Sequence, residues 1–268
     1  SITAVDYIVM AIPVQRVRQV CQLLDKLPRP HKGIINLAKG IEIDSLLRMS
    51  EVIKMVISGS DEKYIATLSG PSHAEEVAAK LPTTVVAASK NPEFAAQVQR
   101  IFNNKILRVY RSTDLIGVEL GGSLKNVIAI ASGITQGFGL GDNTMGALIT
   151  RGLAEITRMG VRLGADPLTF SGLSGIGDLV TTCISRHSRN RYVGEKIGKG
   201  QKLKNVLEGM VMVAEGVDTC RSAQAMAEKY GVEMPITAEV YKVLFEDKPP
   251  DRAIAELMSR SLKEEIWN

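Results

Sequence analysis

Short apolar runs alternate with helix-like stretches over residues 1–111, and beyond that point the strand-like runs stop. The runs have the length and composition of buried parallel strands, which are apolar on both faces. They occupy residues 7–12, 33–38, 65–68, 84–88 and 106–109. The helix-like stretches among them occupy residues 14–27, 72–80 and 92–102. Strands that alternate with helices predict a parallel sheet covered by helices.

The change of pattern predicts a second domain. After Ser112 only helical periodicity remains, in segments joined by Gly-rich turns. These segments are residues 114–135, 144–163, 191–197, 219–230, 237–245 and 250–262. A shift of this kind marks a domain boundary. We therefore predict an α/β domain over residues 1–111 followed by an all-α domain over residues 112–268.

The composition narrows the class of protein. The chain has 268 residues, 45% of them apolar and 23% charged, as in ordinary globular proteins. Its net charge of +4 is mild and no dense Lys/Arg run occurs, which argues against nucleic-acid binding. Cys21, Cys183 and Cys220 are far apart and form no Cys-x-x-Cys pair, so we expect no metal site and a reducing compartment, the cytoplasm. No uninterrupted apolar run is long enough to span a membrane.

Lys125 is a charge inside the apolar stretch from Val118 to Ile134. Apolar residues recur at spacings of three and four around most of this stretch, which predicts a largely buried helix. Burial lowers the pKa of an ammonium group and turns it into a usable proton donor and acceptor. The alternative is that Lys125 extends its ammonium to water past apolar neighbours. The small Gly121 and Gly122 nearby favour a site, because they let another backbone or a ligand approach.

Two further segments follow predicted strands. Lys39 comes directly after the run at residues 33–38, where ligands bind in open parallel sheets, although it also fits a plain turn. The segment from Ser72 to Glu75 fits a helix capping box. Gly70 and Pro71 before it leave backbone amides open at a positive helix end, which can hold a phosphate or carboxylate. An ordinary capped helix and an anion site both remain open from these residues.

Asp178 follows a Gly-x-Gly turn and precedes an apolar run, so one interpretation is a helix cap. In the other interpretation it faces Lys125, orients the amine and opposes the fall in its pKa. Arg186, Arg189 and Arg191 follow soon after, among Ser and Asn residues. They can form a fork for a phosphate, whereas a solvated basic turn is the ordinary expectation for such a cluster.

One fingerprint is absent from the sequence. A dinucleotide-binding sheet opens with a strand, a Gly-x-Gly-x-x-Gly turn and a helix, yet the first glycine of this chain is Gly33. Later Gly-x-Gly pairs lack the third glycine and follow no predicted strand. No Gly-x-x-x-x-Gly-Lys-Ser/Thr loop occurs either, which excludes the simplest nucleotide-triphosphatase.

The ordered set of motifs nevertheless resembles the bacterial and plastid type of NAD(P)-dependent glycerol-3-phosphate dehydrogenase over essentially the whole chain. Each motif is weak alone, but their joint order and spacing make coincidence improbable. The motifs are Tyr7-Ile8-Val9-Met10-Ala11-Ile12-Pro13, Ala38-Lys39-Gly40-Ile41-Glu42, Leu68-Ser69-Gly70-Pro71-Ser72, Gly117-Val118-Glu119 through Lys125-Asn126-Val127, Gly172-Leu173-Ser174-Gly175-Ile176-Gly177-Asp178-Leu179, Ser188-Arg189-Asn190-Arg191 and Ala214-Glu215-Gly216.

The resemblance implies reversible reduction of dihydroxyacetone phosphate to sn-glycerol 3-phosphate by hydride from NAD or NADP in its reduced form, feeding glycerophospholipid synthesis. It implies that Lys125 is the general acid and base, with Asp178 as its partner and Lys39 polarising the carbonyl. The implied substrate contacts are Lys39, Gly70, Ser72, Lys125, Asp178, Ser188, Arg189 and Asn190. The implied cofactor contacts are Lys39, Ala74, Arg189, Val213 and Glu215.

The start of the chain departs from the family pattern. Members begin with the strand, glycine loop and helix that hold the pyrophosphate, so we expect a fragment of an incomplete Rossmann-type domain that lacks roughly 60–75 residues, at about 30 per βα unit. We expect such a chain to bind NAD(P)H poorly, to turn over little and to expose a sheet edge that promotes aggregation. The residue that distinguishes NAD from NADP follows the second strand of a complete domain, so the cofactor preference stays open.

Other functions remain open from the sequence. A 3-hydroxyacid or 6-phosphogluconate dehydrogenase would share the lysine near an asparagine, but we would not expect it to combine Ser188-Arg189-Asn190 with Gly70-Pro71-Ser72. A truncated binding module would bind ligands without hydride transfer. Pairing of helical domains into a homodimer is a further expectation, as is the plastid stroma if the source is eukaryotic.

Overall fold

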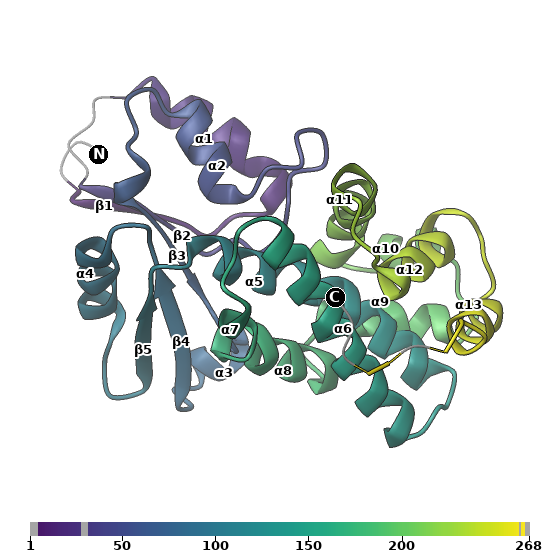
Figure 1. Cartoon of the computed structure of the whole chain (residues 1–268). Coiled ribbons are helices and arrows are strands. Elements are labelled where there is room, and N and C mark those ends of the chain that lie inside the picture. Colours follow the sequence, from purple (N-terminus) through teal and green to yellow (C-terminus); the bar gives the residue numbers. More distant parts are fainter. Residues whose placement is uncertain (1–4, 28–31, 263, 266–268) are drawn as a thin grey trace.

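The computed structural model describes residues 5–27, 32–262 and 264–265. A sheet domain precedes a helical domain, and α5 lies where the two meet (Figure 1). This confirms the predicted class, α/β followed by all-α. The strands are β1 (Tyr7–Met10), β2 (Gly33–Asn36), β3 (Ile65–Ser69), β4 (Thr83–Ala88) and β5 (Leu107–Ser112).

The helices of the sheet domain are α1 (Val17–Asp25), α2 (Met49–Val56), α3 (Ala74–Ala78) and α4 (Pro92–Phe102), with short 3-10 turns at Val14–Arg16 and Glu62–Tyr64. Neighbouring residues on one strand face different helices. Ile34 packs with α1 and α2, whereas Ile35 packs with Phe94 and Val98 of α4. The sheet is therefore covered on both faces, which explains why its strands are apolar throughout.

The five described strands form one sheet in the order β1-β2-β3-β4-β5. β1, β2 and β3 run parallel, as do β4 and β5, but β3 and β4 are antiparallel. The prediction of an all-parallel sheet is wrong for this pair. The link between β3 and β4 contains only the five-residue α3. A helix that short does not return the chain to the opposite edge, so β4 starts at the edge where β3 ends.

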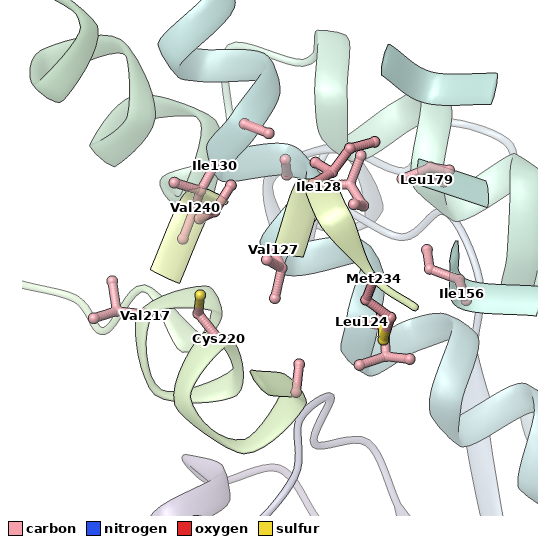
Figure 2. Packing of buried hydrophobic residues seen from close by; sticks show 14 of the residues in the cluster. Leu124, Val127, Ile128, Ile130, Ile156, Leu179, Val217, Cys220, Met234 and Val240 are labelled. Carbon is pink, nitrogen blue, oxygen red and sulfur yellow. The ribbon is translucent and has the colours of Figure 1, made fainter. Parts of the chain in front are cut away.

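The helical domain is built around α5 (Leu115–Gly137). Its other elements are α6 (Asp142–Arg162), α7 (Pro167–Phe170), a π turn (Leu173–Gly177), α8 (Asp178–Ile184), α9 (Arg189–Gly198), α10 (Leu203–Glu208), α11 (Glu215–Tyr230), α12 (Pro235–Phe245) and α13 (Pro250–Met258). Side chains of α5 meet apolar side chains from α6, α8, α11 and α12 (Figure 2). Among the described residues α5 alone is long and apolar enough to cross a membrane, and 94% of that stretch is buried within the protein. It is the central helix of a packed core.

The predicted elements differ from the observed ones in detail. The helix expected over residues 72–80 is only Ala74–Ala78, and α2 at Met49–Val56 was not predicted. The predicted capping box is wrong, because the N-cap is His73, with no side-chain cap. Ser72 instead donates from Oγ to the carbonyl oxygen of Gly70, 3.0 Å away.

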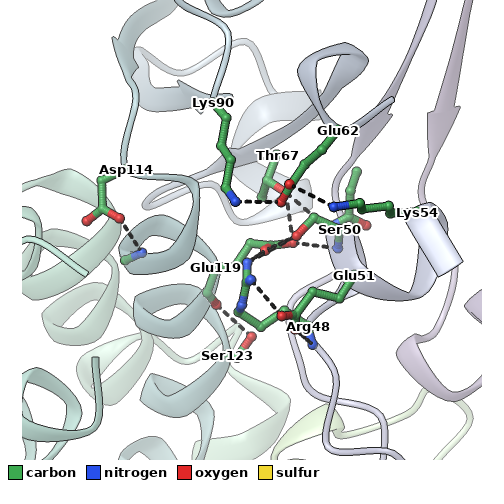
Figure 3. Close-up of polar contacts among 12 residues, drawn as sticks. Arg48, Ser50, Glu51, Lys54, Glu62, Thr67, Lys90, Asp114, Glu119 and Ser123 are labelled. Carbon is green, nitrogen blue, oxygen red and sulfur yellow. Dashed lines mark hydrogen bonds and ion pairs between the residues drawn. The ribbon is translucent and has the colours of Figure 1, made fainter. Parts of the chain in front are cut away.

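Glu119 of α5 joins the two domains through a fully buried polar cluster (Figure 3). One carboxylate oxygen accepts from Arg48 Nη1 and from Ser50 Oγ, each at 2.6 Å. The other accepts from the backbone N–H of Ser50 at 2.9 Å and from Thr67 Oγ1 at 3.2 Å. The start of α2 and strand β3 are thereby fixed to the first third of α5.

Candidate active site

Two lysines and one aspartate meet where the helical domain touches the sheet. Lys125 Nζ, from the middle of α5, donates to Asp178 Oδ1 at 2.6 Å. Lys39 Nζ, from the loop after β2, donates to Asp178 Oδ2 at 2.7 Å. The Asp178 side chain is only 2% exposed, and that of Lys125 only 7%. The cluster therefore holds two cationic groups for one carboxylate in a desolvated place.

Thr182 completes the surroundings of Lys125. It lies one turn after Asp178 on α8, and its Oγ1 accepts from Lys125 Nζ at 2.6 Å. The sequence interpretation did not include Thr182, although its spacing of four from Asp178 on an expected helix was an available signal. The two residues together hold the lysine amine from one helix face.

Burial and charge set the ionisation of this cluster. Burial lowers the pKa of Lys125 to about 8, with a further lowering by Lys39 and an opposing effect from Asp178. For Asp178, burial alone would raise the pKa, but Lys125 and Lys39 outweigh it and keep the pKa below its ordinary value. Asp178 therefore stays a carboxylate, while the amine of Lys125 titrates close to neutrality.

Local structure explains how Lys39 reaches the cluster. The carbonyl of Lys39 accepts from Asn126 Nδ2 at 3.2 Å, and its ammonium donates to the carbonyl of Gly70 at 2.8 Å. Gly122 of α5 lies against the Lys39 side chain, and a Cβ there would stand 2.6 Å from Ser69 Oγ. Gly121 similarly faces the backbone of Ser174. These glycines let the strand-end loop and the π turn approach α5, as their small size predicted.

A cavity of about 1030 Å³ opens beside the cluster. It extends from the carboxyl ends of β1 and β2, at Pro13 and Ala38, to the start of α9. Of the predicted site residues, those in its wall are Lys39, Ser72, Ala74, Lys125, Ser188, Arg189, Asn190, Val213 and Glu215. Gly70 and Asp178 stand behind the wall and hold Lys39 and Lys125 in place. His73, Thr182, His187 and Met212 also contribute to the wall and were not among the predicted site residues.

The start of α9 forms the far side of the cavity. Ser188 caps the helix by accepting from the Arg191 N–H, and Asn190 Oδ1 accepts from the Gly216 N–H at 2.9 Å. Arg189 Nη1 donates to the carbonyl of Val213 at 2.9 Å. A fork of three arginines does not form, because Arg191 Nε is turned to the carbonyl of Ser185, and Arg186 is exposed outside the cavity wall. Arg189 is the arginine of this group that faces the cavity.

The cavity fits the reactive end of a nicotinamide dinucleotide. It lies at the carboxyl ends of parallel strands, where such ligands bind in open α/β sheets. Its volume exceeds what a three-carbon phosphate ester needs. Glu215 is held at this end by the N–H of Val14, at 3.2 Å, and burial raises its pKa. The described residues contain no glycine turn after a strand to hold a pyrophosphate, and no cluster of three His, Cys, Asp or Glu suited to a metal.

A buried lysine–carboxylate pair thus lies beside a cavity at the strand ends, where a mostly parallel sheet domain meets a helical domain. This arrangement is that of the two-domain dehydrogenases that the resemblance implies, and sequence comparison shows the family. The family model for the NAD-dependent glycerol-3-phosphate dehydrogenase N-terminus matches residues 1–95, and that for the C-terminus matches residues 114–255. The chain belongs to the NAD(P)-dependent glycerol-3-phosphate dehydrogenase family, as the resemblance predicted.

Named relatives support the assignment. A glycerol-3-phosphate dehydrogenase [NAD(P)+] of Prosthecochloris aestuarii is 54% identical over 98% of this chain and 80% of its own length. One from Geobacter sulfurreducens is 54% identical over 99% of this chain and 79% of its own length. The crystal structure of the Coxiella burnetii glycerol-3-phosphate dehydrogenase matches with a TM-score of 0.92 at 38% identity, covering 97% of this chain and 79% of that one. The chain thus spans about four fifths of these relatives.

Proposed function

We propose that the protein reduces dihydroxyacetone phosphate reversibly to sn-glycerol 3-phosphate, with NAD(P)H as the hydride donor. The observation that carries the proposal is the Lys125–Asp178–Lys39 cluster beside the strand-end cavity, in a chain of this family. When bound, the nicotinamide supplies a hydride to the ketone carbon. The residues of the chain bind the ketone, orient it and move the proton.

Lys125 is the proton donor for reduction and the acceptor for oxidation. With a pKa near 8 the amine is largely protonated at neutral pH and loses its proton at little cost. Proton transfer from a positioned side chain contributes about 10²- to 10⁴-fold to a rate. Asp178 and Thr182 fix the position of the amine, and Asp178 prevents burial from lowering its pKa further.

Lys39 stabilises the negative charge that develops on the carbonyl oxygen during reduction. A fixed cation is most effective where water is excluded, and the side chain of Lys39 is only 21% exposed. Gly70 holds this ammonium through its carbonyl, and Ser72 lies beside it at the cavity wall. Ser188, Arg189 and Asn190 bind the phosphate end of the substrate, with a guanidinium and a helix N-terminus available for the anion.

Ala74, Arg189, Val213 and Glu215, together with Lys39, would hold the cofactor when it is bound. All five belong to the cavity wall. The exposed side chain of Val213 offers an apolar surface there, and the carboxyl of Glu215 offers an acceptor for an amide or hydroxyl group. The cofactor preference between NAD and NADP, and association into a homodimer, stay predictions. The cytoplasm is the proposed compartment, since Cys21, Cys183 and Cys220 are free and buried; the plastid alternative also stays a prediction.

The direct test is oxidation of NADH by dihydroxyacetone phosphate. It uses the 268-residue chain and a version extended by any coding sequence found upstream. Lys125→Ala is the loss-of-function variant, and Lys105→Ala, an exposed lysine outside the cavity wall, is the matched control. In whichever form turns over, we expect turnover to disappear in Lys125→Ala and to persist in Lys105→Ala.

Substrate panels separate the alternatives. With NAD(P)+ as the hydride acceptor, a higher kcat/KM for a 3-hydroxy acid or 6-phosphogluconate than for sn-glycerol 3-phosphate would replace the proposed substrate with that of another dehydrogenase of this class. Binding of sn-glycerol 3-phosphate without hydride transfer in both forms would instead support the non-catalytic binding module.

A further inference from the structure

His73 has a titratable side chain and belongs to the cavity wall, as do Ser72 and Thr182. Neither the fold nor the proposed chemistry gives this side chain a role. The ring of His187, which also belongs to the wall, lies 5.9 Å away between centroids and is tilted by 50°. Two of the three histidines of the chain thus meet at one cavity.

The hydrogen bonding of the His73 ring is incomplete. Nε2 is buried and has no hydrogen-bond partner. An unmatched buried polar atom is costly, and in a cavity wall it indicates a ligand as the missing partner.

The charges around His73 specify the kind of ligand. Lys125 of α5 disfavours the protonated ring, whereas Asp178 of α8 and Glu76 of α3 favour it more weakly. Burial is the largest influence, and together with Lys125 it lowers the pKa of His73 below its ordinary 6.5. Lys39 and Arg189 add further cationic groups to the same cavity. A ligand that brought a dianion would reverse this balance and favour the protonated ring, whose nitrogens are both donors.

We propose that His73 binds the phosphate group of the substrate through Nε2, taking up a proton as it does so, while the ring of His187 holds it in position. This inference rests on the proposed function, because a phosphate ester is the anion it requires. Nε2 is buried in the present orientation of the ring and has no protein partner to lose. The ring torsion of histidine is soft, so the ring can turn Nε2 toward the cavity without a backbone change. The phosphate would then be held between His73 on one side and the start of α9 on the other.

The proposal couples binding to pH with a defined sign. The pKa of His73 is below 6.5 in the free protein and rises when the phosphate arrives. The contribution of His73 to affinity is therefore complete at acidic pH and is lost as pH rises through the pKa of the complex. The phosphate ester itself loses about one proton as pH rises through about 6, which makes it a stronger anion. Wild type and variant must therefore be compared with the same ligand, so that this effect cancels.

The experiment is isothermal titration calorimetry of sn-glycerol 3-phosphate, with inorganic phosphate as a second probe and glycerol as the probe without phosphate. Each titration is run near neutral pH in two buffers of different ionisation enthalpy, so that the slope gives the protons taken up. The proteins are wild type, His73→Phe, which keeps a flat ring without hydrogen bonding, and His73→Gln, which can donate but does not titrate. Thermal unfolding verifies that each is folded. No cofactor is required.

We expect His73→Phe to bind sn-glycerol 3-phosphate about 10- to 100-fold more weakly, the typical effect of losing a charge-assisted hydrogen bond. His73→Gln should recover part of the affinity but not the proton uptake, a separation that a purely structural role would not produce. Glycerol binding should be the same in all three proteins. Equal affinity and equal buffer slopes in wild type and variants would overturn the inference and leave the proposed function intact. A wild type that bound no phosphate ester would overturn both.

Discussion

Helix α5 carries two buried ionic clusters that differ in how completely they are satisfied. In the Glu119 cluster Arg48 pairs with Glu119 and with the partly exposed Glu51. Hydroxyl and amide donors occupy the remaining acceptor positions of Glu119. The Lys125 cluster lies less than two turns further along α5 and pairs two ammonium groups with the single carboxylate of Asp178. Figure 3 shows the Glu119 cluster. The first cluster lies outside the cavity wall, whereas Lys125 and Lys39 of the second are part of it.

The difference separates stability from chemistry. A cluster whose buried acceptors are all hydrogen-bonded fixes the relative position of two domains. A cluster with surplus positive charge and little water has an amine whose pKa is lowered to about 8. We expect substitutions in the first to act on unfolding and substitutions in the second to act on turnover.

The largest effect should come from Lys125→Met, which keeps the apolar stem and removes the amine. Turnover of dihydroxyacetone phosphate should fall by about 10²- to 10⁴-fold, because the proton donor is lost. The melting temperature should change little, since Asp178 keeps its ion pair with Lys39. Steady-state kinetics and calorimetry on the form that turns over provide the measurement. Near-normal kcat in a folded Lys125→Met protein would end the assignment of Lys125 as the acid.

Glu119→Leu should act in the opposite way. It leaves Arg48 buried without its closest carboxylate, which costs about 3–5 kcal/mol in comparable buried pairs. Urea unfolding measures the change. The matched control is Glu51→Gln, which removes the half-exposed partner of the same Arg48 and should cost at most about 1 kcal/mol. If Glu119→Leu were as stable as Glu51→Gln, the cluster would not be what holds the domains together.

The pH profile tests the surplus charge directly. Reduction needs the protonated amine of Lys125, so its rate should fall as pH rises through about 8, while oxidation should rise over the same range. Removing the charge of Lys39 in Lys39→Gln takes away a cause of the lowering and should move both limbs to higher pH. The measurement is kcat against pH for wild type and Lys39→Gln. If kcat changed over the same pH range in both proteins, the titrating group would not be Lys125.

The smallest effect concerns a third buried carboxylate, Glu155 of α6, which accepts from the N–H groups of Ile236 and Thr237 at the start of α12. Burial raises its pKa from the ordinary 4.5 to about 7. The folded protein then binds the proton of Glu155 more tightly than the unfolded chain does. Protonation of Glu155 therefore contributes to the free energy of unfolding below pH 4.5, and this contribution is lost as pH rises through 7. Glu155→Gln should flatten that decline in melting temperature, and an identical decline in both proteins would contradict the assignment.

The sequence predicted those features that depend on local pattern. Period and composition located all five strands and α5, and the order of motifs gave the family. The antiparallel β4 escaped prediction because strand direction depends on the length of α3, which ends earlier than its pattern suggested. Of the two interpretations of the arginine cluster, the fork of three arginines did not form, since the side chain of Arg191 donates to the carbonyl of Ser185.

By itself the sequence determined that Lys125 would be a charge within an apolar helix, because the periodicity of its neighbours leaves no polar face for it. Only the tertiary structure decided what surrounds that charge. Asp178, Thr182 and Lys39 come from an α8 helix and a strand-end loop that are distant in sequence and meet at α5 through packing. The pKa of Lys125 depends on these distances and on the exclusion of water, and neither quantity exists until the two domains are in contact.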